Sequence, residues 1–285
     1  MTIAGISFFM YGMTLASENL QKLAANKIRG LISKLSDRPI VGVFVGILLT
    51  ILIQSSGAVT SMLVGLGTAG VVTLQQVMGV ILGTAIGTTI TVQILSLNVA
   101  QYGLPLFTFA FVFYFLSKKR PFRRAMAVVM GFGLIFYGLE LIGQGTQAIR
   151  ETNYFINSLE YFKENPVVAI IVTAIFTAIV HSSAVTVGFA MSLAASGLIS
   201  LTDAIYWVYG ANIGTTATAL VASLGGNYIA RQIAWAHCFY KTASVFLFYF
   251  FTSQFAQWIQ SSHIQRDVAN SHTIFNIIAA LIFLP

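Results

Sequence analysis

Two short polar motifs stand 127 residues apart, each at the end of an apolar run that is too short to cross a membrane. The first run, 40–53, ends at Gln54-Ser55-Ser56, and the second, 166–180, ends at His181-Ser182-Ser183. A helix of about fifteen residues rises about 22 Å, whereas the hydrocarbon core of a bilayer is about 30 Å thick. A second short apolar run follows each motif. We therefore predict that each motif forms the tip of a re-entrant helical hairpin, where protein or water must cover the polar backbone.

The two motifs belong to an internal duplication that contains no gap between them. Gly83-Thr84-Ala85-Ile86-Gly87-Thr88-Thr89 recurs, at the same offset of 127, as Gly210-Ala211-Asn212-Ile213-Gly214-Thr215-Thr216. Each copy lies inside an apolar stretch that is long enough to cross, so we predict two transmembrane helices broken at this motif. We divide the chain into a first transmembrane repeat, 1–124, and a second, 125–285, which carries an extra C-terminal helix.

Composition and charge predict an all-α polytopic membrane protein with inverted repeats. Of the 285 residues, 57% are hydrophobic and only 8% are charged, against about 25% charged in soluble domains. Ten of the fifteen lysines and arginines lie in two runs, 22–38 and 118–124, which is typical of cytoplasmic loops rather than of a nucleic-acid-binding surface. Each repeat has an odd number of crossings, so the second must be inverted, and both basic runs then share one side. This architecture is typical of secondary transporters, and we expect a multi-pass protein of the cell inner (plasma) membrane.

The repeated motifs supply hydroxyls, amides and backbone groups, but no lysine or arginine. Helix N-termini bind anions, and each is equivalent to about +0.5 charge. Two facing termini would leave a divalent anion under-neutralised, so we expect co-bound cations, and neutral oxygen ligands suit sodium. The alternative interpretation is that these small polar residues only allow helices to pack closely.

The motifs resemble those of the type II sodium–phosphate cotransporter family, particularly its bacterial members. The resemblance covers nearly the whole chain, including Phe136-Tyr137-Gly138 and His272-Thr273-Ile274-Phe275-Asn276. It implies sodium-coupled phosphate symport by alternating access, with sodium as the co-transported ion, no organic cofactor and no enzymatic activity. The phosphate ligands that it implies are Gln54, Ser55, Ser56, His181, Ser182, Ser183 and Asn212. The sodium ligands that it implies are Gln54, Ser56, Thr88, Thr89, Ser183, Asn212, Thr215 and Thr216. Many bacterial members carry a soluble PhoU-like domain, which we expect this chain to lack.

The chain departs from the family pattern at several positions. Gly57 and Ala184 replace the third serine of each motif, and His181 replaces the second glutamine. Fewer hydroxyls leave the number of sodium sites open, while His181 either donates to phosphate and adds pH dependence or simply fills the place of the glutamine. Lys241 lies where the family tends to place asparagine. Its role stays open between a functional intramembrane charge and a lysine that snorkels to the interface.

Three other functions fit the sequence less well. Symport of another oxyanion, such as sulfate or arsenate, is the nearest alternative, because serine and backbone donors recognise shape more than identity. An intramembrane Ser/His enzyme lacks an acidic residue within either motif to orient His181 as a base. A passive channel is disfavoured because two re-entrant motifs that meet at one point suit an occluded site. The expected partners are phosphate, sodium ions and the lipid bilayer, without nucleic acid, and the sequence leaves open a monomer or a dimer.

Overall fold

The computed structural model describes residues 1–33, 38–97, 99–149 and 153–284, and within these ranges its regular secondary structure is entirely helical. Lys34 of the first basic run, and Arg150, lie outside the described residues. The first half contains α1 (Thr2–Ile32), α2 (Pro39–Ile53), α3 (Ser56–Thr68), α4 (Leu74–Leu95), a short 3-10 turn (Ala100–Tyr102) and α5 (Gly103–Leu116). The second contains α6 (Arg120–Ile149), α7 (Asn153–Glu164), α8 (Pro166–Val180), α9 (Ser183–Ala195), α10 (Leu201–Gly214), α11 (Thr216–Ser223), α12 (Tyr228–Tyr249), α13 (Thr252–Ile259) and α14 (Ile264–Ile282).

The predicted re-entrant hairpin of the first repeat is confirmed. Helices α2 and α3 meet at a bend of 119°. Helices α2 and α4 run parallel, because Gly42 lies against Gly79 and, one turn further along both helices, Gly46 lies against Gly83. Two parallel helices that begin at the same side of the membrane require α3 to return the chain to that side. The glycines remove the side chains that would otherwise hold the two backbones apart.

The second repeat reproduces this arrangement 127 residues later. Gly210 on α10 lies against Thr173 on α8, and Gly214 lies against Thr177, again one turn further along both helices. Helices α8 and α10 are therefore parallel, and α9 returns the chain as α3 does. Proline opens both half-length helices at the first helical position, where its missing N–H would be unpaired in any case.

Helices α1 and α6 show how the two repeats are related in space. Gly5 lies against Gly138, and Gly12 lies against Gly131, so the contacts run in opposite directions along the two helices. In sequence, Gly5 corresponds to Gly131 and Gly12 to Gly138. Equivalent helices thus cross antiparallel at equivalent glycines, which supports the inverted relation. The predicted boundary at 124/125 falls in the first turns of α6 and stays a prediction.

The predicted break inside 74–97 is wrong, because α4 is one continuous helix. Thr84, Thr88 and Thr89 each donate to a carbonyl oxygen of their own helix, at 2.7–3.0 Å, and so do not disrupt it. Every fourth residue from 79 to 87 is a glycine that lies against α2. The glycines therefore serve close packing rather than a chain break. In the second repeat the interruption is a single residue, Thr215, between α10 and α11.

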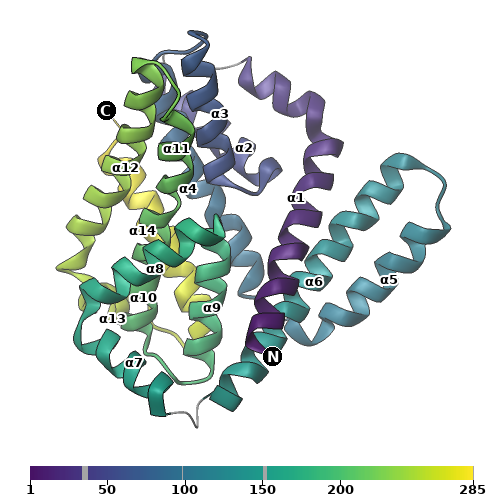
Figure 1. Cartoon of the computed structure of the whole chain (residues 1–285), viewed down its shortest axis with the longest axis vertical. Helices are drawn as coiled ribbons and strands as arrows, with labels where there is room; N and C mark the ends of the chain where they lie inside the picture. The colour runs from purple at the N-terminus through teal and green to yellow at the C-terminus, as the bar shows by residue number, and fades with distance from the viewer. Residues whose placement is uncertain (34–37, 98, 150–152, 285) are drawn as a thin grey trace.

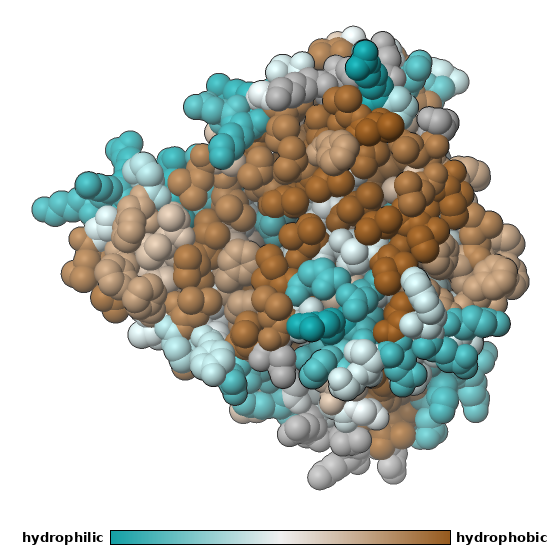
Figure 2. Space-filling model, turned by 180° about the vertical axis from the view of Figure 1, so that it is seen from behind, coloured by the Kyte–Doolittle hydropathy of each residue, from teal (hydrophilic) through white to brown (hydrophobic). Residues whose placement is uncertain are grey.

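The chain is a multi-pass membrane protein. Helix α4 and residues 120–146 of α6 are long and apolar enough to cross a bilayer. Figure 2 shows an apolar belt across the middle of the molecule, with hydrophilic residues gathered above and below it. The C-terminal end of α1 and the α5–α6 connection lie toward the upper end in Figure 1, whereas α7 lies at the lower end. Both basic runs therefore share one side, as predicted.

Candidate functional site

The tips of the two hairpins have the same unusual backbone. Among the described residues, Gln54 and His181 are the only ones other than glycine with positive φ, at 59° and 57°. Each ends its helix in the left-handed conformation, and the next residue, Ser55 or Ser182, is extended and is the N-cap of the following helix. Glycine is the usual residue at such a helix end, and a residue with a Cβ costs about 1–2 kcal/mol there. Residues held in such conformations cluster at functional sites.

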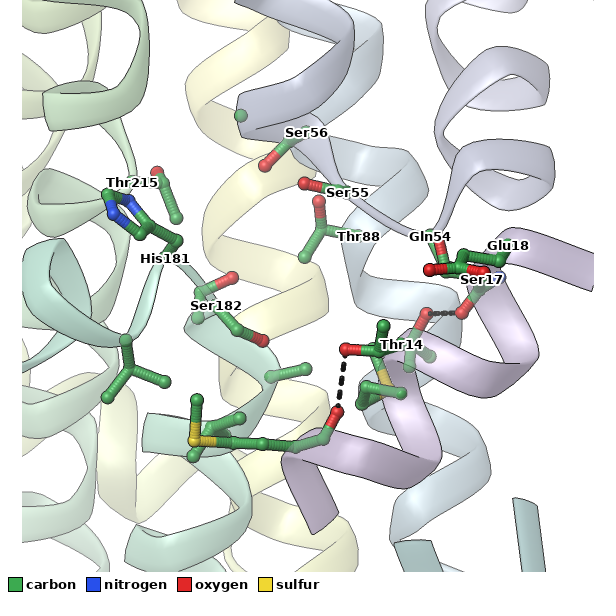
Figure 3. A pocket seen from close by; sticks show the side chains of 18 residues that line it. Thr14, Ser17, Glu18, Gln54, Ser55, Ser56, Thr88, His181, Ser182 and Thr215 are labelled. Atoms are coloured by element: carbon green, nitrogen blue, oxygen red, sulfur yellow. Dashed lines mark hydrogen bonds between the residues drawn. The ribbon is translucent and has the colours of Figure 1, made fainter. Parts of the chain in front are cut away.

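The two tips face each other across a cavity of about 270 Å³ (Figure 3). Ser55 and Ser56 lie on one wall, and His181 and Ser182 lie on the other. The structure brings the two motifs together, although they are 127 residues apart in sequence. Of the residues predicted to bind phosphate or sodium, the following line the cavity: Gln54, Ser55, Ser56, Thr88, His181, Ser182, Ser183 and Thr215.

Two helices begin at the cavity wall. Helix α3 starts at Ser56 and α9 starts at Ser183, and both serines line the cavity. The first-turn N–H groups of a helix have no partner within it, and together they carry about half a positive charge. Ser55 caps α3 by accepting from Ala58 N at 3.1 Å, whereas Ser182 makes no capping bond to α9. The cavity is therefore lined by hydrogen-bond donors that suit a small oxyanion.

The side chain of Gln54 is fixed by hydrogen bonds on both sides of its amide. Its Nε2 donates to Ile51 O at 2.6 Å, and its Oε1 accepts from Thr91 Oγ1 at 2.8 Å. Ser17 on α1 donates to Ile53 O at 2.6 Å. Sequence reasoning missed Ser17 and Thr91 as cavity residues. Thr91 recurs as Thr218 in the duplication and could have been found, whereas Ser17 belongs to no motif.

Gly57 lies close to a side chain of the other repeat. A Cβ at this position would collide with the hydroxyl of Thr218, from the other repeat. The absence of a side chain at Gly57 therefore allows the two repeats to approach closely here.

Three predicted site residues do not line the cavity. The hydroxyls of Thr89 and Thr216 each donate to a carbonyl oxygen three residues earlier in their own helix, at 2.7 Å. Asn212 is buried, and its Oδ1 accepts from Lys241 Nζ at 2.6 Å. Their roles as phosphate or sodium ligands stay predictions.

The charge balance near the cavity differs from the one expected from the motifs. The motifs contain no basic residue, but folding brings Lys241 of α12 to Asn212, which lies one turn before the cavity residue Thr215. Glu18 lies at the cavity on α1, where it pairs with Lys22 at 3.2 Å. Within the described part of the chain, no group of three histidines, cysteines or carboxylates could hold a metal ion.

Comparison with known proteins places the chain in a family. The model of the family described as Na+/Pi-cotransporter matches residues 8–144 and 146–276. The protein YqeW of Bacillus subtilis is 28% identical over 282 residues, which are 98% of this chain and 92% of that protein. YjbB of Escherichia coli, whose name refers to inorganic phosphate export, is 24% identical over 99% of this chain, which spans only 52% of that protein. The mouse sodium-dependent phosphate transport protein 2A is 34% identical over 98 residues, 33% of this chain and 15% of that protein. No solved structure matches the chain.

Proposed function

Because the chain belongs to the Na+/Pi-cotransporter family, we propose that it carries inorganic phosphate together with sodium ions across the inner membrane of the cell. The family assigns the chain to phosphate transport rather than to an enzymatic activity. What we propose is the coupling to sodium, the transport path across the membrane and the residues that bind the two ions. The observation that carries it is the pair of helix N-termini, at Ser56 and Ser183, that begin at one cavity from opposite repeats.

Phosphate is held in this proposal by hydroxyls and by the first-turn N–H groups of α3 and α9. Ser55, Ser56, Ser182 and Ser183 all line the cavity. Two helix termini supply about one positive charge in total, so a divalent phosphate stays under-neutralised in a site of low dielectric. Sodium ions that bind with phosphate relieve this shortage, and this mutual dependence is the physical basis of coupling.

Alternating access follows in this proposal from the two-fold relation of the repeats. The repeats share the cavity, and they also pack through the antiparallel glycines of α1 and α6. A cavity between inverted repeats opens to one side or the other when one repeat moves against its partner. The substrate itself then stays near the middle of the membrane.

The direction of net transport depends on the gradients of the two ions. A symporter driven by an inward sodium gradient takes up phosphate, and the same cycle runs outward when the phosphate gradient dominates. Export is the second candidate, because the E. coli relative is named for it. Another oxyanion, such as sulfate or arsenate, remains the alternative substrate, since hydroxyl and N–H donors respond mainly to shape and charge.

The test is transport of phosphate-32 by the purified protein in proteoliposomes. With an imposed inward sodium gradient, we expect phosphate to accumulate above its equilibrium level, and replacement of sodium by choline should abolish this accumulation. Excess unlabelled sulfate should not compete. Uptake that is indifferent to sodium, or entry of sulfate in place of phosphate, would overturn the proposal. Efflux from phosphate-loaded vesicles, with the sodium gradient reversed, measures the export direction.

A further inference from the structure

Lys241 is a charged residue in the middle of α12, and the structure buries it. The residue is 3% exposed, and its Nζ donates to Asn212 Oδ1 at 2.6 Å and to Asn276 Oδ1 at 2.9 Å. No carboxylate pairs with it among the residues that the structure describes. A lysine that snorkels places its ammonium in water, which this one does not. A buried intramembrane charge held only by neutral groups calls for a functional explanation.

The two asparagines form a site for a cation. Asn212 Nδ2 donates to Val208 O at 2.9 Å, and Asn276 Nδ2 donates to His272 O at 2.7 Å. Each amide nitrogen thus donates to a carbonyl oxygen of its own helix. Each amide oxygen accepts from the same ammonium. Oxygens from α10 and α14 converge on one positive charge. Neutral oxygens of this kind are also the ligands of hard metal cations.

A segment of α14 resembles the segment of α12 that ends at the lysine. His237-Cys238-Phe239-Tyr240-Lys241 on α12 and His272-Thr273-Ile274-Phe275-Asn276 on α14 share the histidine and an aromatic fourth residue, and they differ in the last residue. In this comparison Lys241 corresponds to Asn276. Asparagine at 241 would give three amides around one point, whereas this chain has two amides and an ammonium.

The cation site is connected to the cavity. Asn212 O accepts from Thr215 Oγ1 at 2.8 Å, and Thr215 lines the cavity. Residues three apart on a helix are neighbours on its surface. The ammonium therefore lies behind the cavity wall, and in a medium of low dielectric its charge acts on an anion in the cavity.

We propose that the ammonium of Lys241 is a resident cation that takes the place of one co-transported sodium ion. The inference rests on sodium-coupled phosphate symport as proposed above. It predicts that this chain needs one sodium ion fewer per phosphate than a variant with asparagine at position 241. In that variant, Asn212, Asn276 and the new amide bind a sodium ion from solution.

The test compares Lys241→Asn with the wild type in two measurements. In proteoliposomes, the Hill coefficient of phosphate uptake against sodium concentration should rise in Lys241→Asn, because one more sodium ion is then linked to transport. In detergent without phosphate, sodium chloride should raise the melting temperature of Lys241→Asn above its value in choline chloride by more than it does for the wild type. Lys241→Arg keeps the charge and should retain the sodium dependence of the wild type. The control is Lys163→Asn, an exposed lysine on α7, which should change neither measurement.

An unchanged Hill coefficient together with an unchanged sodium stabilisation in Lys241→Asn would overturn the inference. If Lys241→Asn is not recovered as folded protein, Lys241→Gln is read in the same way. Failure of both variants to fold even at high sodium concentration also overturns it, because sodium then does not replace the ammonium. Absence of sodium-driven phosphate transport in the wild type would instead refute the proposed function. The melting measurement distinguishes this failure from a failure of the inference about Lys241, because it detects sodium binding without any transport.

Discussion

Gln54 and His181 occupy equivalent positions in the two repeats and share a left-handed backbone, at the tips of hairpins that meet at one cavity. Both retain a polar side chain where glycine would relieve the backbone. The amide oxygen of Gln54 accepts a hydrogen bond from Thr91 and so joins the first hairpin to α4. His181 is exposed in the structure, so its side chain faces the space that a substrate would enter. The tips thus combine backbone strain with polar groups directed at the cavity.

The left-handed backbone makes a prediction about stability at His181. His181→Val should have a free energy of unfolding about 1–2 kcal/mol lower than that of His181→Gly, because a β-branched residue is poorly accommodated at positive φ. His181→Gly should be neutral or stabilising, since glycine adopts this conformation without strain. Thermal unfolding in detergent measures both variants. His263→Val is the control, because His263 is exposed and has φ −122°. Equal melting temperatures for the valine and glycine variants at 181 would contradict the prediction.

The serines at the starts of α3 and α9 should contribute separately to phosphate binding. Ser56→Ala and Ser183→Ala each remove one hydroxyl from the cavity wall, and a hydrogen bond to a charged group is worth about 1.5–3 kcal/mol. Each variant should therefore raise the half-saturating phosphate concentration by roughly tenfold or more. Concentration series of phosphate-32 uptake give this value.

The control for the serine variants is Ser7→Ala on α1. Ser7 is exposed, and its hydroxyl donates to Ile3 O of its own helix at 2.9 Å, so uptake should not change. Normal half-saturation in both cavity variants would refute a phosphate site built from the two motifs.

The glycine contact between α1 and α6 should be intolerant of a methyl group. A Cβ at Gly12 would lie 2.6 Å from the carbonyl oxygen of Gly131, so Gly12→Ala must push the two helices apart. We expect a loss of about 1–3 kcal/mol, as for other overpacked interiors. Gly30→Ala, on the same helix, meets no atom within 4 Å and should gain about 0.5–1 kcal/mol from helix propensity. Melting temperatures that shift in the same direction for both variants would show that the contact is not rigid.

Sequence predicted the parts of the fold that depend on segment length and order. The hairpins followed from apolar runs shorter than a bilayer, and the inversion followed from an odd number of crossings. The break in α4 was wrong because glycine and threonine also mark close helix packing, and only the neighbouring α2 distinguishes the two uses. Helices α7 and α13 were missed because they are short and lie outside the long apolar runs.

The sequence predicted the parts of the site that belong to motifs. It missed the parts that depend on how each helix is rotated about its axis. The duplication located both hairpin tips, because equivalent segments of inverted repeats meet at their interface. Lys241 and Asn212 lie 29 residues apart on different helices, and Ser17 reaches Ile53 from α1. Such contacts depend on which face each helix turns toward its neighbour. A single sequence does not reveal that face when apolar residues surround the whole helix.

Sodium and phosphate should each increase the effect of the other on stability. Any ligand that binds only the folded protein stabilises it, by about 2.7 kcal/mol at a hundred times its Kd. If phosphate is held by helix termini that leave it under-neutralised, its affinity falls when sodium is absent. Linkage then requires that phosphate strengthen sodium binding by the same factor. We therefore expect phosphate to raise the melting temperature clearly in sodium chloride and only slightly in choline chloride of equal ionic strength. The Ser56→Ala/Ser183→Ala double variant should lose most of the shift in sodium. A phosphate-induced shift of equal size in both salts would show that the anion site is already neutralised by the protein, and sodium coupling would then need another physical origin.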